Sequence, residues 1–208
     1  MGNVTRSGVR IPLLSRKKKN RIIVEPDELV ARAQGIDFEE YLPKYIKRDS
    51  SLTSNQTDIL NKHWHDILVP VEEKVGHNST NSKGFHETFY DRLFELHPGL
   101  RELFGGDMEK QGNALVEMIS EILFMLPASP NLLPELEKLA MRHVGYGAVP
   151  EHYSVVGEVL LYALGVCSSP DQWTTEIQDA WLSAYSIMMM AIIPTTIKIM
   201  ESRSKTFS

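Results

Sequence analysis

The segment that decides the predicted fold is 139–153, LAMRHVGYGAVPEHY. His143 ends an apolar stripe at helical spacing, and a turn with two glycines separates it from a new helix that starts at Pro150. A histidine on an apolar helical face is usually a core residue with a hydrogen-bond partner. The alternative is that the imidazole points into a space enclosed by other helices and holds a ligand there. The neighbouring segments decide between the two.

Length and composition limit the class of protein. With 208 residues, 42% hydrophobic and 24% charged, the chain fits one globular domain plus an extension. Cys167 is the single cysteine, which excludes an internal disulfide framework and favours a reducing compartment. No apolar stretch approaches the roughly 18 residues of a membrane span, and the N-terminus lacks a signal-peptide core. These features predict a cytoplasmic protein.

Positive charge is concentrated at the N-terminus. Residues 1–21 carry seven Lys or Arg side chains and no acidic residue; because the whole chain carries −5, the remainder carries −12. Such a tail on an acidic body is expected first as a solvated, flexible segment, with an anionic membrane surface as partner or nuclear targeting as the functional alternatives. Acylation of Gly2 would need Ser or Thr where Arg6 stands. No nucleic-acid partner is expected.

Residues 1–51 are predicted to be a basic, partly disordered extension. Within it, EPDELVARAQG and DFEEYLPKYIKRD suggest short helices, which would be stable only if they pack on the body. From residue 52 onward, apolar residues recur at helical spacing and no strand-like alternation of useful length is present. Helices are expected within 51–64, 85–97, 108–126, 132–143 and 150–167 and from Asp171 onward, with a loop at 76–84. The predicted fold class is all-α.

Four side chains from three of these helices could surround one ligand. His143 ends its stripe, Gln111 and Leu115 lie one turn apart on an earlier helix, and Tyr90 lies on the helix before that. A neutral imidazole on one side, with a phenol and an amide on the other, suits a haem iron that carries a diatomic gas. These residues favour a ligand role for His143 over a core role.

Residues 52–203 resemble a globin, and the closest pattern is that of the flavohaemoglobin-like and bacterial single-domain globins. The resemblance rests on four motifs in the family's order: FYDRLFELHPGLRELF (89–104), KQGNAL (110–115), LAMRHVGYGAVPEHYSVVGEVLL (139–161) and DAWLSAY (179–185). It implies the globin fold, with three-over-three helical packing, and haem b (iron protoporphyrin IX) as the cofactor. Residues 204–208 would then be a short tail.

The resemblance also implies the residues of the site. On the proximal side, His143 would be the iron ligand and Tyr153 would support it. On the distal side, Tyr90 and Gln111 would hold bound O₂, Leu115 would lie over the iron, and Phe104 would be wedged against the haem. Apart from the resemblance, the other residues have structural alternatives too, as His143 has in a core role. Phe104 and Leu115 suit any helical core, Gln111 suits an exposed helix, Tyr90 could bind a backbone carbonyl, and Tyr153 could simply pack between helices.

Two features depart from the family pattern. The dioxygenases of this family carry a reductase after the globin, whereas few residues follow the last expected helix here. They also carry a glutamate in the last helix, at a position that falls on Thr196 in this sequence. Without that carboxylate, the imidazole should donate less electron density to the iron.

Two functions follow from the resemblance. The first is reversible binding of O₂, and also of CO and NO, for sensing, storage or redox chemistry; two distal donors should slow O₂ release, which disfavours bulk oxygen transport. The alternative is a nitric oxide dioxygenase that takes its electrons from a separate reductase. Because the resemblance begins after the extension, removing residues 1–21 should leave the haem chemistry unchanged.

Overall fold

The computed structural model describes residues 22–24, 29, 33–68, 84–126 and 132–206. It confirms the all-α class for these residues. The α-helices are α2 (Ser54–Leu68), α3 (Phe85–Leu96), α4 (Met108–Met125), α5 (Leu132–Gly145), α6 (Pro150–Val166) and α7 (Thr175–Thr206). Two 3-10 helices, η1 (Glu39–Tyr41) and η3 (Pro98–Leu103), and two short strands, β1 (Ile22–Val24) and β2 (Leu52–Thr53), complete the described elements.

Helix ends follow from local chemistry. The Asp107 carboxylate caps α4 by accepting a hydrogen bond from the backbone N–H of Lys110 at 3.0 Å. Pro150 opens α6, where the missing N–H costs nothing. After α5, the backbone N–H of Ala148 donates to the carbonyl of His143 at 2.9 Å, and Gly147 adopts a φ of +90°, which favours glycine. The turn that follows His143 is therefore fixed by its sequence.

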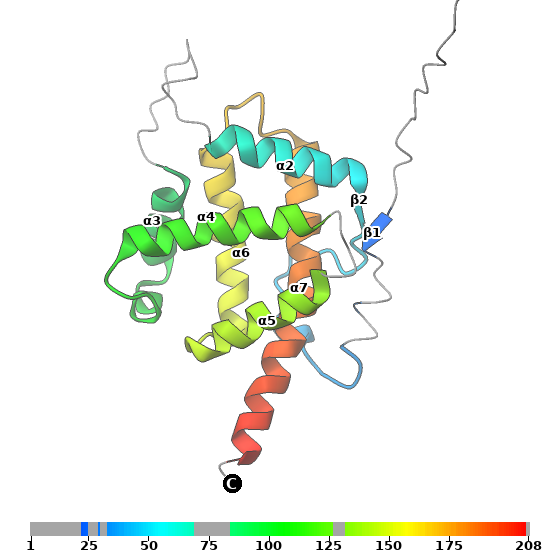
Figure 1. Cartoon of the computed structure of the whole chain (residues 1–208), viewed down its shortest axis with the longest axis vertical. Helices are drawn as coiled ribbons and strands as arrows, with labels where there is room; N and C mark the ends of the chain where they lie inside the picture. The colour runs from blue at the N-terminus through cyan, green and yellow to red at the C-terminus, as the bar shows by residue number, and fades with distance from the viewer. Residues whose placement is uncertain (1–21, 25–28, 30–32, 69–83, 127–131, 207–208) are drawn as a thin grey trace, which may run out of the picture.

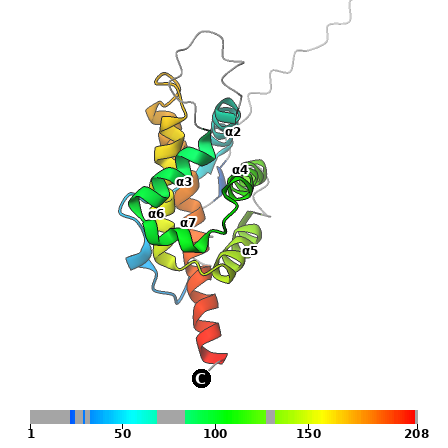
Figure 2. The ribbon, with the colours of Figure 1, turned by 90° about the vertical axis from the view of Figure 1, so that its left-hand side faces the viewer.

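The helices cross in two layers. In Figure 1, α6 and α7 run along the long axis of the molecule while α2, α4 and α5 cross them. The view turned by 90° shows the same crossing from the side (Figure 2). α5 makes its main contacts with α7, and α3 makes its main contacts with α6. This arrangement places α4 and α5 on the same side of the α6–α7 pair, one above the other.

The long helix α7 forms much of the core. By length and composition, its residues 175–205 could cross a membrane, so the expectation that no apolar stretch approaches such a length is wrong. However, 78% of its most apolar window is buried within the protein. Core burial therefore accounts for its apolar side chains.

Three sequence-based expectations need correction or lie outside the described residues. The last helix begins at Thr175, not at Asp171, because the Thr174 hydroxyl accepts the backbone N–H of Ile177 at 3.4 Å and caps the helix there. The strands β1 and β2 pair antiparallel but are too short to produce an alternating sequence pattern. Most of the helix expected at 25–35 and most of the 76–84 loop lie outside the described residues, as do residues 1–21; residues 33–35 are described and form a turn.

A segment that we call the strap, residues 33–53, packs on the helical body. Within it Phe38 and Leu52 are buried. The Tyr45 hydroxyl donates to the carbonyl of Ser154 in α6 at 2.7 Å. The expectation that this part of the chain packs on the body is confirmed, although most of it lies within the predicted extension.

Candidate functional site

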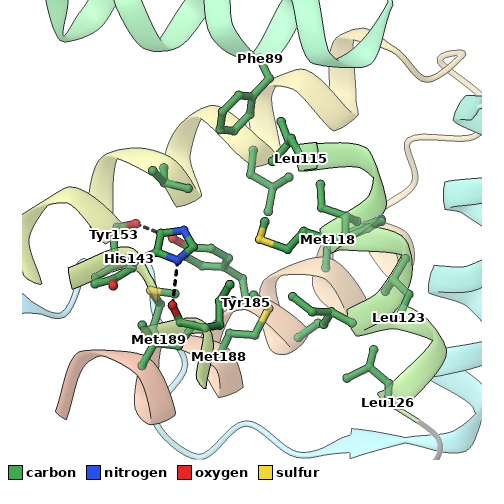
Figure 3. A pocket seen from close by; sticks show the side chains of 18 residues that line it. Phe89, Leu115, Met118, Leu123, Leu126, His143, Tyr153, Tyr185, Met188 and Met189 are labelled. Carbon is green, nitrogen blue, oxygen red and sulfur yellow. Dashed lines mark hydrogen bonds between the residues drawn. The ribbon is translucent and has the colours of Figure 1, made fainter. Parts of the chain in front are cut away.

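A largely apolar cavity lies between α4, α5, α6 and α7. It encloses about 750 Å³ of space not filled by protein atoms, its opening to solvent included. Figure 3 shows the 18 side chains that line it. Leu115 and Met118 come from α4, His143 from α5, and Met188 and Met189 from α7. A cavity bounded mainly by apolar side chains suits a hydrophobic cofactor better than a polar ligand.

Among the described lining residues, His143 is the one whose ring nitrogens can bind a metal. It sits in the last turn of α5, and its imidazole projects into the cavity (Figure 3). Its Nδ1 lies 2.9 Å from the carbonyl oxygen of Leu139. Because a carbonyl can only accept, Nδ1 carries the proton and Nε2 keeps its lone pair. Burial lowers the pKa of His143, with the Leu139 carbonyl opposing this shift, so the neutral imidazole that metals require is favoured.

Tyr153 lines the cavity beside His143, as expected. The centroids of the two rings are 6.4 Å apart. The Tyr153 hydroxyl pairs with the hydroxyl of Thr196 at 3.1 Å, and the Thr196 side chain is fully buried. Tyr153 therefore contacts His143 through ring packing, while its hydroxyl is bonded to α7.

The structure places only one of the four predicted distal residues in the cavity wall. Leu115 lines the cavity, whereas Tyr90, Gln111 and Phe104 form a neighbouring cluster outside its walls. The buried Tyr90 hydroxyl donates to the backbone carbonyl of Gln111 at 3.3 Å, and burial raises its pKa to about 12. The ring of Phe104 lies 5.3 Å from the ring of Tyr90, measured between centroids. The structure thus brings together His143, Tyr153 and Leu115; the other three roles stay predictions.

Sequence reasoning did not identify most of the wall residues. From α7, the cavity is lined by Trp181, Tyr185, Met188 and Ile192, among others. The sequence itself marks these four at helical spacing on the last helix, but it does not show that this face lines a cavity. Tyr185 also donates its hydroxyl to the backbone carbonyl of Tyr153. It therefore links α6 and α7, which both line the cavity.

Comparisons with known proteins agree with this architecture. A family model described as Globin matches residues 87–192, about half of the chain. The flavohemoprotein of Bacillus subtilis is 32% identical over 132 residues, which are 60% of this chain and 30% of that protein. The flavohemoprotein of Vibrio cholerae is 30% identical over 128 residues, which are 60% of this chain and 31% of that protein. The chain thus spans about a third of the length of these curated relatives.

Solved structures share the fold. An engineered carbene transferase from Rhodothermus marinus, provisionally described as a nitric oxide dioxygenase, superposes with a TM-score of 0.58 at 19% identity, covering 74% of this chain and 99% of that one. A bacterial globin from Campylobacter jejuni superposes with a TM-score of 0.54 at 22% identity, covering 72% of this chain and 99% of that one. The fold and the family model lead to one conclusion: this chain is a member of the globin family.

Proposed function

We propose that the protein binds haem b in this cavity through Nε2 of His143 and binds O₂ reversibly at the iron. One observation carries the proposal: the 2.9 Å contact between Nδ1 of His143 and the Leu139 carbonyl, which leaves Nε2 free inside an apolar cavity. Bound haem would supply an iron atom with a site for a diatomic gas. Membership in the globin family supports haem as the group that binds in this cavity.

The protein side chains would shape that site. The apolar walls, including Leu115 and Met118, would favour a neutral gas ligand over a charged one. Tyr90 and Gln111 would serve as hydrogen-bond donors to the ligand if their side chains turn toward the cavity. Each such bond contributes about 0.5–1.5 kcal/mol net, which would slow ligand release. Slow release would suit sensing, storage or redox chemistry with O₂, and the same site would also bind CO and NO. We propose that the protein acts in the cytoplasm.

The alternative is a nitric oxide dioxygenase served by a separate reductase. The similarity to two flavohemoproteins and to the Rhodothermus marinus structure favours this alternative. The bond between Tyr153 and Thr196 argues against it, because the partner of the tyrosine hydroxyl is a neutral hydroxyl rather than a carboxylate. A neutral partner adds no negative charge near His143 and so gives less electron donation toward the iron.

Spectra and a turnover assay test the two functions. Absorption spectra of the purified protein in the oxidised, reduced and CO-bound forms should show the bands of histidine-ligated haem. A protein that shows no haem bands after haem is added would refute the proposal. Steady-state NO consumption with an added flavin reductase then distinguishes the two functions, since only a dioxygenase should consume NO continuously.

A further inference from the structure

The strap is anchored to both long helices behind the cavity. The Tyr45 hydroxyl donates to the carbonyl of Ser154 in α6 at 2.7 Å. Two residues later, the backbone N–H of Lys47 donates to the hydroxyl of the fully buried Ser186 in α7 at 3.1 Å. The Lys47 ammonium also lies 2.9 Å from a carboxylate oxygen of Asp179. Within three residues, the strap therefore binds one helix and then the other.

Each anchor adjoins a tyrosine that lines the cavity. Ser154 follows Tyr153 in α6, and Ser186 follows Tyr185 in α7. The two tyrosines are themselves joined, because the Tyr185 hydroxyl donates to the backbone carbonyl of Tyr153. The strap thus binds one turn of α6 and one turn of α7, and each of these turns also carries a tyrosine that lines the cavity.

Gly157 allows these hydroxyls to converge. A Cβ at this position would lie 2.2 Å from Cε1 of Tyr185 and 2.5 Å from the hydroxyl oxygen of Tyr45. Two side chains from distant parts of the chain thus occupy the space that a side chain at Gly157 would fill. Burial raises the pKa of both Tyr45 and Tyr185, so both phenols stay protonated and remain donors. The two hydroxyls donate to the backbone carbonyls of two adjacent residues in α6, Ser154 and Tyr153.

We infer that Tyr45 is a positioning residue for the haem pocket, which holds the first turns of α6 so that the ring of Tyr153 keeps its place beside His143. The path is short: Tyr45 holds Ser154, the next residue after Tyr153, and the ring of Tyr153 lies 6.4 Å from that of His143 between centroids. The inference rests on the proposed haem binding. It assigns to the segment before the helical body a part in tuning the proximal side of the site.

The test compares Tyr45→Phe with Tyr41→Phe in the full-length holoprotein. Both variants remove one phenol oxygen from the strap, but only that of Tyr45 bonds to α6. The measurements are the iron–histidine stretching band of the reduced protein by resonance Raman spectroscopy, the haem reduction potential, and the rate of O₂ dissociation. Loss of direct partners of metal ligands typically changes affinity or activity about 10–100-fold, so a more remote residue should change O₂ dissociation by roughly 2–10-fold.

Tyr45→Phe should retain haem, shift the iron–histidine band and change the O₂ rate, while Tyr41→Phe should match the parent. Ser186→Ala removes the second anchor and should shift the iron–histidine band in the same way. It replaces Tyr45→Phe in the test if that variant does not fold. A lower melting temperature with an unchanged band and potential would show that the anchors only stabilise the fold and would overturn the inference. A parent protein without haem would instead refute the proposed function, so the two failures are distinguishable.

Discussion

Nδ1 of His143 lies 2.9 Å from the carbonyl oxygen of Leu139, four residues earlier in α5. Both groups belong to one helix, so the helix itself sets the orientation and the tautomer of the imidazole. Nε2 is thereby directed into the cavity. A ligand held in its binding geometry before the metal arrives loses less conformational freedom on binding.

Replacing Tyr90 by Phe should accelerate O₂ dissociation. If the hydroxyl reaches the gas ligand, the loss of one hydrogen bond worth about 0.5–1.5 kcal/mol corresponds to a roughly 2- to 12-fold faster rate. Stopped-flow measurement of O₂ release is the assay. Gln111→Leu should have a smaller effect, and the double variant should be non-additive, because two donors to one acceptor are coupled. Parent rates in both variants would leave Tyr90 in the role the structure shows, as a donor to the Gln111 carbonyl.

Replacing Thr196 by Val should lower the free energy of unfolding. The side chain is fully buried and its hydroxyl pairs with that of Tyr153 at 3.1 Å, so the variant leaves the tyrosine hydroxyl without this partner. The expected loss is about 1–3 kcal/mol, measured by urea denaturation. Thr195→Val is the matched control, because that hydroxyl donates only to the Ala191 carbonyl within its own helix. Equal losses in the two variants would contradict a special role for the Thr196 hydroxyl.

Acid should destabilise the protein through His63. Its ring is 3% exposed and accepts the indole N–H of Trp181 at Nδ1, 2.9 Å away, which leaves Nε2 to donate to Ser168 at 2.8 Å. Burial lowers the pKa of His63 from 6.5 to about 4, with Asp66 opposing the shift and Lys62 adding to it. Between these two values the unfolded chain binds a proton that the folded chain does not. Stability is therefore full above pH 6.5 and falls as the pH drops toward 4.

The slope from one such proton is at most about 1.4 kcal/mol per pH unit. The measurement is the free energy of unfolding between pH 4 and pH 7 for the parent and for His63→Gln, which cannot titrate. His65→Gln controls for a neighbouring histidine on the same helix. An acid slope that persists unchanged in His63→Gln would assign the effect to other groups.

Removing residues 1–21 should abolish binding to anionic vesicles. Seven basic residues near such a surface contribute on the order of 1 kcal/mol each. Sedimentation with phosphatidylserine vesicles measures the effect, and raising the salt should weaken it because the Debye length is only about 8 Å at physiological ionic strength. The CO spectrum should stay unchanged in the truncated protein. Equal sedimentation with and without the tail would leave it as a solvated appendage.

Local patterns in the sequence predicted the helices and the place of His143. The stripe Leu132, Leu136, Leu139 and His143 follows the helical repeat, and glycine and proline mark where α5 ends and α6 begins. Both signals arise from residues close in sequence, which is why they are visible without a structure. The resemblance supplied the order of the remaining elements and placed Leu115 and Tyr153 at the cavity.

Contacts between distant residues could not be predicted in this way. Tyr45 and Ser154 are 109 positions apart, and nothing near either residue marks the pair. The orientation of the Tyr90 hydroxyl likewise depends on helix packing, which brings the Gln111 carbonyl within hydrogen-bond distance of it. Side-chain direction and long-range anchoring are set by tertiary packing, so they emerge only from the structure.

The most direct test of haem binding is the absorption spectrum of His143→Ala after haem is added. The account predicts that the parent shows the reduced and CO-bound bands of histidine-ligated haem, whereas the variant either fails to retain haem or recovers these bands only with added imidazole. Imidazole can enter the space left by the side chain and replace its Nε2. A variant that shows the parent's reduced spectrum without imidazole would contradict His143 as the iron ligand.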